Sequence, residues 1–516
     1  MPLLVLTAAA WLWQAALLRS RGLLTHDEAI SLISAAGTAR QVDALYSSEE
    51  RLGLYRADQL QALLRPSPDS EPAQVLDSLA NYDVHPPLYF MVLHGLQRLG
   101  LTRHAWLRLP GIVALILGAI VAHRLVWPDG PFAVRCLATA WLLVNPVLIE
   151  TATELRQYGF VLLGMILALA GLIAHFEGRT ADRKAILLLT LAPVLMLWSQ
   201  VGTAVWVACA LFVACIPARR NQPGARRRLT WALVIAAAVC LPLAWWWLTE
   251  AHGLGPADSI PLARVGSELL VPILSSLGKS WCSLPGRLHG SAVWSVIACC
   301  VLGLAFWAIV AGRNVLDRLL LCAALGWGAI WFALLWSATL PAHALEPKHL
   351  FPLVLCPWVL LVRAACTSPR RWVRPLALAA MIGSLVAHGL GAVQWAQARS
   401  LNDFAGRLQA AECLIATSPR RGYLMPLVDR MSPAATVVIA APNVALEHWS
   451  QVEPELPTDD LLVAAIGRPR GDDQQSAMRR LLEVLAAEYS RMREVRNEPV
   501  RTVTAFGRRR QPSEAP

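Results

Sequence analysis

The sequence predicts an all-α polytopic membrane protein with about 11 transmembrane helices, followed by a small external α/β domain. Of the 516 residues, 56% are hydrophobic and only 16% are charged, whereas soluble domains carry about 25% charged residues. Apolar runs of about 18 residues or more recur as far as residue 395, and each is long enough to cross about 30 Å of hydrocarbon. From residue 396 onward the composition becomes polar, which indicates a separate soluble domain over 396–516.

The first apolar run is predicted to be an uncleaved span, because no basic residue precedes it and no small-residue cleavage site follows it. The segment 86–99 is also apolar, but its fourteen or so residues are too few for a span and typical of an interfacial helix. The predicted spans lie near residues 2–18, 108–126, 131–149, 158–176, 184–200, 202–217, 229–248, 291–311, 318–337, 350–366 and 374–394.

The basic residues indicate the orientation. If 86–99 does not cross the membrane, the short loops on one side carry sixteen basic residues and those on the other side five. The positive-inside rule places the richer side in the cytoplasm. We therefore expect a multi-pass protein of a bacterial plasma membrane with a cytoplasmic N-terminus. The loops 19–107 and 249–290 and the C-terminal domain are then external, and the net charge of +11 reflects orientation rather than nucleic-acid binding.

The external C-terminal domain is predicted from two patterns. Residues 436–441 form a short apolar run typical of a buried strand. Residues 475–493 form a helix, because apolar side chains recur there at helical spacing, with Tyr489 as the last of them. The eleven cysteines lie mostly inside apolar runs without paired spacing, which favours small buried side chains over a disulfide framework or a metal site.

Asp27 and Glu28 follow the first span directly. Adjacent carboxylates at the membrane surface can supply a general base for an acceptor hydroxyl. The alternative is a helix start, in which Thr25 is the N-cap and the two acidic residues interact with the positive end of the helix dipole.

His85 precedes two prolines in the sequence His85-Pro86-Pro87-Leu88-Tyr89. The prolines are predicted to begin the interfacial helix at a fixed angle. His85 would then lie at the level of the lipid headgroups, where it can contact an anion. A purely structural turn is the alternative.

Two further groups are candidates for anion binding. Arg156, between Glu154 and Tyr158 at the outer start of a span, can bind a phosphate with two hydrogen bonds, or pair with Glu150 or Glu154 instead. Lys348 and His349 precede another span and can form an anion site at its N-terminus, unless Lys348 merely extends toward the interface. No phosphate loop, metal-ligand cluster or catalytic triad is present, so no motif supports a divalent metal.

The order of these motifs resembles the GT-C fold glycosyltransferases, specifically the protein O-mannosyltransferase and aminoarabinose-transferase superfamily, over about residues 1–395. The resemblance rests on Asp27-Glu28, on the His85 to Tyr89 segment, on Arg108-Leu109-Pro110 and on Glu154 to Tyr158. It implies a GT-C fold and the inverting transfer of a sugar from a polyprenyl-phosphate donor to a hydroxyl at the outer face. The acceptor can be a protein, a lipid or a glycan.

The resemblance also implies roles for individual residues. Asp27 is the expected general base, with Glu28 beside it, and a sugar linked to polyprenyl phosphate is the expected donor. The expected substrate-binding residues are His85, Glu154, Arg156, Tyr158, Lys348 and His349. Ser199-Gln200 replaces a His-Tyr pair of many relatives, and Lys348-His349 replaces Arg-Tyr, so a different donor or acceptor preference, or an inactive relative, remains an alternative.

Two other functions fit a polytopic chain: a transporter or flippase for lipids or polysaccharides, and a non-catalytic scaffold. Transporters usually carry ionisable residues at mid-membrane depth. Here the interiors of the predicted spans are nearly free of them and polar residues gather at the outer ends. This pattern favours a reaction at the external interface, with membrane lipids as the surroundings.

Overall fold

The computed structural model describes most of the helical and sheet segments of the chain. The described residues are 2–46, 52–83, 85–126, 130–177, 182–200, 203–204, 206–209, 225–250, 270–282, 293, 296–301, 303, 315–336, 349–368, 371–400, 408–417, 421–456, 461–466, 472–496 and 501–509. The predicted spans 202–217 and 291–311 lie largely outside these residues.

The chain forms two compact units. The first consists of Met1–Leu17, Val84–Tyr89 and Arg108–Ala398, and the second of Leu18–Asp83, Phe90–Leu107 and Arg399–Pro516. This grouping differs from a division at residue 396, because most of the predicted external loop 19–107 belongs to the same unit as the C-terminal segment.

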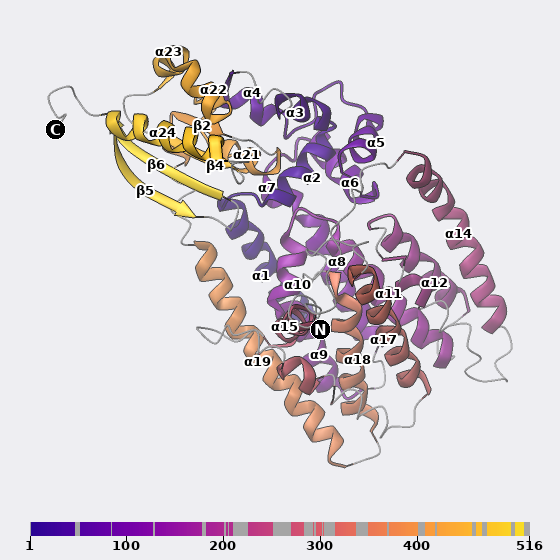
Figure 1. Ribbon diagram of the computed structural model, residues 1–516. Helices are drawn as coiled ribbons and strands as arrows, with labels where there is room; N and C mark the ends of the chain where they lie inside the picture. Colours follow the sequence, from indigo (N-terminus) through magenta and orange to yellow (C-terminus); the bar gives the residue numbers. More distant parts are fainter. Residues whose placement is uncertain are drawn as a thin grey trace. The chain divides into compact units, whose positions relative to one another are not determined.

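The first unit is helical (Figure 1), and its centre is α11 (Tyr158–Glu177). This helix packs against α8 (Leu109–Val121) and α12 (Asp182–Leu197), and 89% of its apolar window is buried. The other helices of the unit, within the described residues, are η1 (Ala122–Val126), α9 (Phe132–Val144), α10 (Pro146–Thr153), α14 (Ala225–Glu250), α15 (Val271–Trp281), α17 (Val315–Trp336), α18 (Phe351–Thr367) and α19 (Val373–Ser400), together with most of α1 (Pro2–Arg21).

Within the described residues, four helices are long and apolar enough to cross a membrane, or five if one bent pair counts as a single span. The bent pair is α9 and α10, which meet at 53°. The span predicted over 131–149 is therefore bent within the segment, and the two helices can together form one broken span. Asn145 ends α9 and caps α10 by accepting hydrogen bonds from the backbone N–H groups of Val147 and Leu148, and Pro146 opens α10.

The second unit contains a six-stranded sheet. Its strands are β1 (Gly53–Arg56), β2 (Cys413–Thr417), β3 (Thr436–Ile439), β4 (Leu461–Ile466), β5 (Tyr489–Arg496) and β6 (Arg501–Arg509), in the order β1-β3-β2-β4-β6-β5. Strands β3, β2 and β4 are parallel to one another, whereas β1, β6 and β5 pair antiparallel with their neighbours. Strand β1 lies in the N-terminal part of the chain, and its pairing with β3 joins that part to the C-terminal segment.

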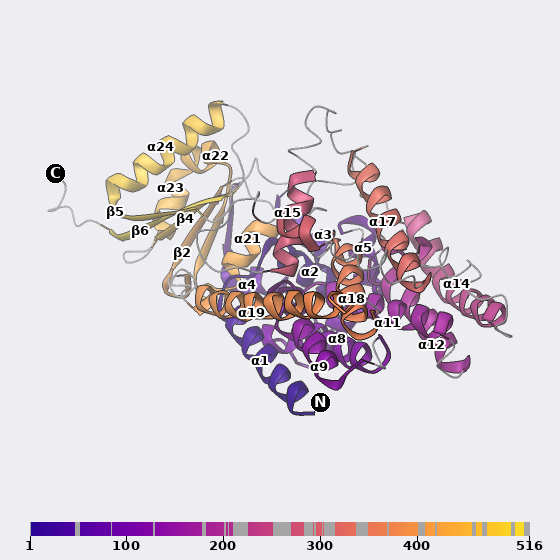
Figure 2. The same cartoon turned by 90° about the horizontal axis from the view of Figure 1, so that it is seen from below.

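Helices cover both faces of this sheet. Leu414, Val437 and Ile439 pack on one face with residues of α4 (Ala57–Ala62) and α21 (Arg421–Val428). Ile415 and Val438 pack on the other face with α22 (Pro442–Glu447) and α24 (Asp472–Glu488), which Figure 2 shows together on that side. The alternation along β2 and β3 follows the two-residue period of a strand.

The remaining helices of the second unit are short. They are α2 (His26–Ala36), α3 (Ala39–Tyr46), α5 (Pro72–Asn81), α6 (Leu88–Arg98), α7 (His104–Leu107), α23 (Trp449–Val452) and η7 (Glu453–Glu455). Helix α6 begins in the first unit and has 11 residues, too few to cross a membrane, as predicted for segment 86–99.

The C-terminal predictions have mixed outcomes. The strand expected at 436–441 is confirmed as β3. The helix expected at 475–493 is wrong at its end, because α24 stops at Glu488 and Tyr489 begins β5. Pairing of β5 with β6 replaces the helical bonds there, and Tyr489 is buried at 0% exposure without lying on the helix.

Candidate functional site

In the first unit, the segment His85 to Tyr89 packs beside the start of α11 and the end of α12. The backbone N–H of Leu88 donates a hydrogen bond to the Trp198 carbonyl at 3.1 Å. The ring of Tyr89, only 1% exposed, meets Phe160 edge to face with ring centroids 5.7 Å apart. His85 itself is half-buried. The His-Pro-Pro motif is thus next to the beginning of α11, where the Glu154 to Tyr158 motif ends.

His349 joins the same region from a distant part of the sequence. Its Nε2 lies 3.4 Å from the Tyr158 hydroxyl, and the two rings meet edge to face at 5.2 Å. Its Nδ1 lies 3.2 Å from Gln200 Nε2. When the Gln200 amide donates to Nδ1, the imidazole carries its proton on Nε2 and donates to Tyr158. The His349 imidazole therefore links Tyr158 at the start of α11 with Gln200 beyond the end of α12.

The connection between α10 and α11 is polar but buried. Thr153, Glu154, Arg156, Gln157 and Tyr158 are each at most 6% exposed. Opposite charges at Glu154 and Arg156 thus lie two residues apart in a buried environment, where a charge is tolerated only with a partner. Arg156, the predicted phosphate ligand, is consequently a buried cation rather than a solvated one.

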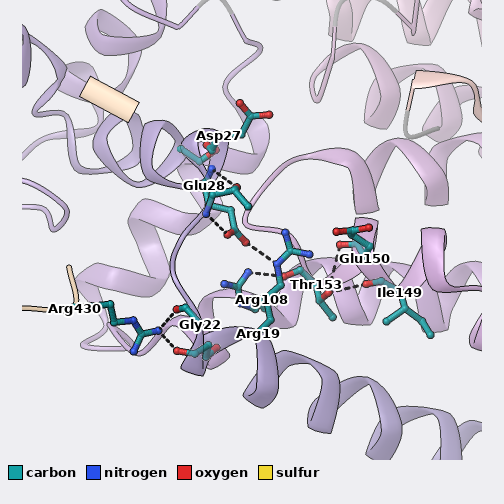
Figure 3. Close-up of polar contacts among 12 residues, drawn as sticks. Arg19, Gly22, Asp27, Glu28, Arg108, Ile149, Glu150, Thr153 and Arg430 are labelled. Atoms are coloured by element: carbon teal, nitrogen blue, oxygen red, sulfur yellow. Dashed lines mark hydrogen bonds and ion pairs between the residues drawn. The ribbon is translucent and has the colours of Figure 1, made fainter. Parts of the chain in front are cut away.

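Arg108 determines how α10 ends. It is 1% exposed, and its Nη1 donates to the Thr153 carbonyl at 2.6 Å (Figure 3). The Thr153 hydroxyl in turn donates to the Ile149 carbonyl at 2.8 Å. Arg108 therefore satisfies a carbonyl at the C-terminus of α10, where no intrahelical donor is left. The Arg-Leu-Pro motif has a structural task in holding the segment that carries Arg156.

Two glycines allow the helices around this segment to touch. A Cβ on Gly111 in α8 would collide with the carbonyl oxygen of Ala152. A Cβ on Gly159 in α11 would lie 2.8 Å from the Cα of Gly111. No side chain separates the backbones at this point, so any larger residue must displace the start of α11.

Sequence reasoning missed two polar side chains of this region. Gln157 and Ser199 are both 0% exposed, and their side-chain polar atoms have no hydrogen-bond partner among the described residues. Buried polar groups are usually satisfied, so these positions suit a bound polar ligand. The sequence signal for Gln157 is a polar residue directly before a long apolar helix, which is unusual. The neighbouring charge of Arg156 is a stronger indication of anion binding and masks this signal.

In the second unit, the predicted catalytic pair adopts the helix-start arrangement. Thr25 Oγ1 accepts from the Glu28 backbone N–H at 3.2 Å, and Glu28 Oε2 accepts from the Thr25 N–H at 2.9 Å, which is a capping box. Glu28 is 0% exposed, and its Oε1 lies 3.1 Å from Arg19 Nε (Figure 3). Asp27 lies on the first turn of α2 and is half-buried.

The structure thus divides the predicted site residues. Tyr158 and His349 meet directly, and His85 and Arg156 belong to the same unit, whereas Asp27 and Glu28 belong to the second unit. Lys348 lies outside the described residues. Within the described parts of the chain, no group of three or more His, Cys, Asp or Glu side chains could hold a metal ion.

The first unit also contains a small apolar pocket. It lies between α11 and α12, and the residues after α12 complete its wall. The lining residues are Ala168, Leu172, Leu189, Ala192, Pro193, Met196, Trp206 and Val207. Such a lining suits a hydrocarbon chain rather than a polar ligand.

No protein-family model matches the sequence, and no curated protein matches it either. Solved structures do match. The structure of ArnT from Cupriavidus metallidurans bound to undecaprenyl phosphate matches with a TM-score of 0.51 at 14% identity, over 98% of this chain and 97% of that one.

Two further solved structures match with lower scores. Arabinofuranosyltransferase AftD from Mycobacteria has a TM-score of 0.39 at 16% identity, over 98% of this chain and 40% of that one. The Archaeoglobus fulgidus oligosaccharyltransferase tethered to an acceptor peptide has a TM-score of 0.41 at 11% identity, over 89% of this chain and 74% of that one. The near-complete mutual coverage with ArnT shows that this chain has the fold of the GT-C glycosyltransferases.

Proposed function

We propose that this protein is a membrane glycosyltransferase that moves a sugar from a polyprenyl-phosphate donor to an acceptor hydroxyl at the outer face of the membrane. The observation that carries the proposal is the meeting of the His-Pro-Pro segment, Tyr158, Gln200 and His349 in a unit with the GT-C fold. ArnT, which shares this fold, is bound to undecaprenyl phosphate, the class of lipid that the proposed donor carries.

The reaction requires a base. A polyprenyl-phosphate sugar is already activated, so no nucleotide is consumed. Asp27 accepts the proton of the acceptor hydroxyl, whose oxygen forms a bond to the anomeric carbon as the bond from that carbon to the phosphate oxygen breaks. A single displacement inverts the configuration at that carbon. Asp27 is better suited than Glu28, because Glu28 is committed to Arg19 and to the capping box.

The departing phosphate requires positive charge. Arg156 and Lys348 are the cations assigned to it, with the imidazole of His349 beside them, and preorganised donors in a buried site stabilise a developing anion more strongly than water does. Tyr158 and Gln200 orient the His349 ring through the bonds to its two nitrogens. We assign Glu154 the role of balancing the charge of Arg156, and His85 the role of shaping the donor or acceptor cleft.

The lipid part of the donor requires an apolar surface. The apolar surface between α11 and α12 is the proposed contact for one segment of the polyprenyl chain, since the residues that line the small pocket there are all apolar. Gln157 and Ser199, buried and without described partners, are the proposed hydrogen-bonding groups for hydroxyls of the sugar.

The test begins with cells that lack the protein, whose missing glycan or glycolipid identifies the sugar and the acceptor. The purified protein in liposomes should then transfer that sugar from its polyprenyl-phosphate donor. Asp27→Asn should lower the turnover about 100-fold or more. The matched control Asp77→Asn changes an exposed carboxylate of the same unit and should leave turnover unchanged. Full turnover in Asp27→Asn removes Asp27 from the mechanism, and movement of the lipid across the bilayer without transfer indicates a flippase.

A further inference from the structure

The turn that follows α21, residues 428–431, collects contacts from the N-terminal part of the second unit. Gln61 Nε2 donates to the carbonyls of Val428 and Met431, both at 2.9 Å. His104 Nε2 lies 3.4 Å from Asp429 Oδ1. One short turn of the C-terminal segment is thereby tied to α4 and to α7.

Arg430 makes the third connection from this turn. Its Nη2 donates to the carbonyls of Ser20 and Gly22, the latter at 2.6 Å (Figure 3). These carbonyls lie at the C-terminal end of α1 and just beyond it, where helices run out of backbone donors. A cation is also favoured at the negative end of the helix dipole.

The Arg430 side chain is itself held in place. It is 16% exposed, and its Nε lies 3.7 Å from Asp429 Oδ2. Burial alone would raise the pKa of the Asp429 carboxyl, but His104, Arg430 and Arg65 outweigh burial and bring that pKa below its ordinary value. Asp429 is therefore ionised at neutral pH and pairs with the Arg430 Nε, while the Arg430 Nη2 bonds to Ser20 and Gly22.

The carbonyls that Arg430 holds belong to the connection between α1 and α2, which carries Asp27. On the α2 side this connection is fixed by the capping box of Thr25 and by the ion pair of Glu28 with Arg19. On the α1 side it is fixed by Arg430. Helix α2 also packs directly against α21, the helix that ends at the 428–431 turn.

We propose that Arg430 is a positioning residue, which sets the geometry of Asp27 through its hydrogen bonds to the carbonyls of Ser20 and Gly22. The inference rests on the proposed function of Asp27. It assigns the C-terminal segment an indirect part in the reaction, because its turn fixes the backbone five residues before the base. Asp27 and Arg430 need not touch for this effect, because the connection is held at both ends.

The experiment has a structural arm that needs no substrate. Hydrogen exchange of the full-length protein in detergent micelles should show faster exchange over residues 18–30 in Arg430→Gln than in the wild type, while the strand at 413–417 keeps its protection. Arg430→Lys should lie between them, since an ammonium keeps the charge but not the planar guanidinium. Gln61→Leu is the matched control, because it removes two hydrogen bonds to the same turn without touching Ser20 or Gly22.

The kinetic arm uses the donor identified for the wild type. Arg430→Gln should lower kcat about 10- to 100-fold with an unchanged KM for the donor, as expected for a misplaced catalytic group. Gln61→Leu should keep the wild-type kcat per folded molecule. Unchanged exchange over 18–30, or loosened exchange with unchanged kcat, overturns the inference. If the wild type transfers no sugar, the proposed function fails, whereas the exchange measurement still decides whether Arg430 holds the connection.

Discussion

Gln200 and His349 are separated by 149 positions in the sequence, yet Gln200 Nε2 lies 3.2 Å from His349 Nδ1, and the opposite nitrogen of the same ring faces Tyr158. The amide therefore fixes both the orientation of the imidazole and the nitrogen that carries its proton. Around this ring, helices from three regions of the chain come together at one place in the first unit.

The Gln200–His349 contact predicts non-additive effects on transfer. Gln200→Leu should lower kcat about 10-fold, because the ring loses the partner that orients it, and His349→Ala should lower it more. The double variant should equal His349→Ala alone, with a coupling of about 1 kcal/mol or more. Steady-state kinetics on the liposome-reconstituted enzyme measure this, with exposed His448→Ala as the control. Additive losses would show that the two residues act separately.

The close contact at Gly111 predicts a large stability effect from one methyl group. Gly111→Ala should destabilise the protein by about 1–3 kcal/mol, because the new Cβ collides with the Ala152 carbonyl and the backbone must shift. Gly95→Ala is the matched control, since its Cβ would meet no heavy atom within 4 Å and alanine favours the helix by about 0.5–1 kcal/mol. Thermal unfolding in detergent distinguishes them, and equal melting temperatures would contradict the contact.

Asp429 predicts a dependence of stability on pH. Its pKa is lowered in the folded protein, because His104, Arg430 and Arg65 outweigh the opposing effect of burial. The unfolded state then binds the proton first, so the stabilisation is present above the ordinary pKa of 3.8 and is lost as the pH falls below it. Asp429→Asn should lower stability at pH 7 and weaken the acid dependence between pH 5 and 3. Denaturant unfolding of the two proteins at these pH values tests the sign.

The distribution of basic residues predicts the orientation in the membrane. In a cysteine-free background, a cysteine at position 255 should react with an impermeant thiol reagent in intact cells, and one at position 224 should react only after permeabilisation. The same labelling in a variant with Arg226, Arg227 and Arg228 replaced tests how strongly this loop sets the orientation. An unchanged labelling pattern would show that the other basic loops suffice. Reaction of position 224 in intact cells would invert the predicted topology.

The sequence predicted the helical class better than the spatial arrangement of its residues. A long apolar run suffices to predict α11, because a chain that crosses a membrane has few alternatives to a helix for satisfying its backbone hydrogen bonds. The break at Asn145 was also visible, since asparagine followed by proline is a helix-start signal inside the apolar run. The overall hydropathy of 131–149 obscured it.

Tertiary contacts could not be obtained from periodicity. Nothing in the local sequence pairs Gln200 with His349, or Arg430 with Gly22, because such contacts depend on how helices pack and not on their own spacing. For Glu28, the same acidic residue type fits a catalytic role and a capping box equally well. Only the burial of Glu28 and its contact with Arg19 show that this residue has the structural role.

The pairing of β1 with β3 has a consequence for biogenesis. Gly53 lies opposite Ile439, so β1 emerges from the ribosome long before the strand that it joins. Strand β1 stays unpaired while the intervening helices are synthesised. This large sequence separation between contacting residues is expected to slow the final assembly. During that interval the segment is exposed to chaperones, proteases and other chains, and we expect quality control of this protein to act on the segment that contains β1.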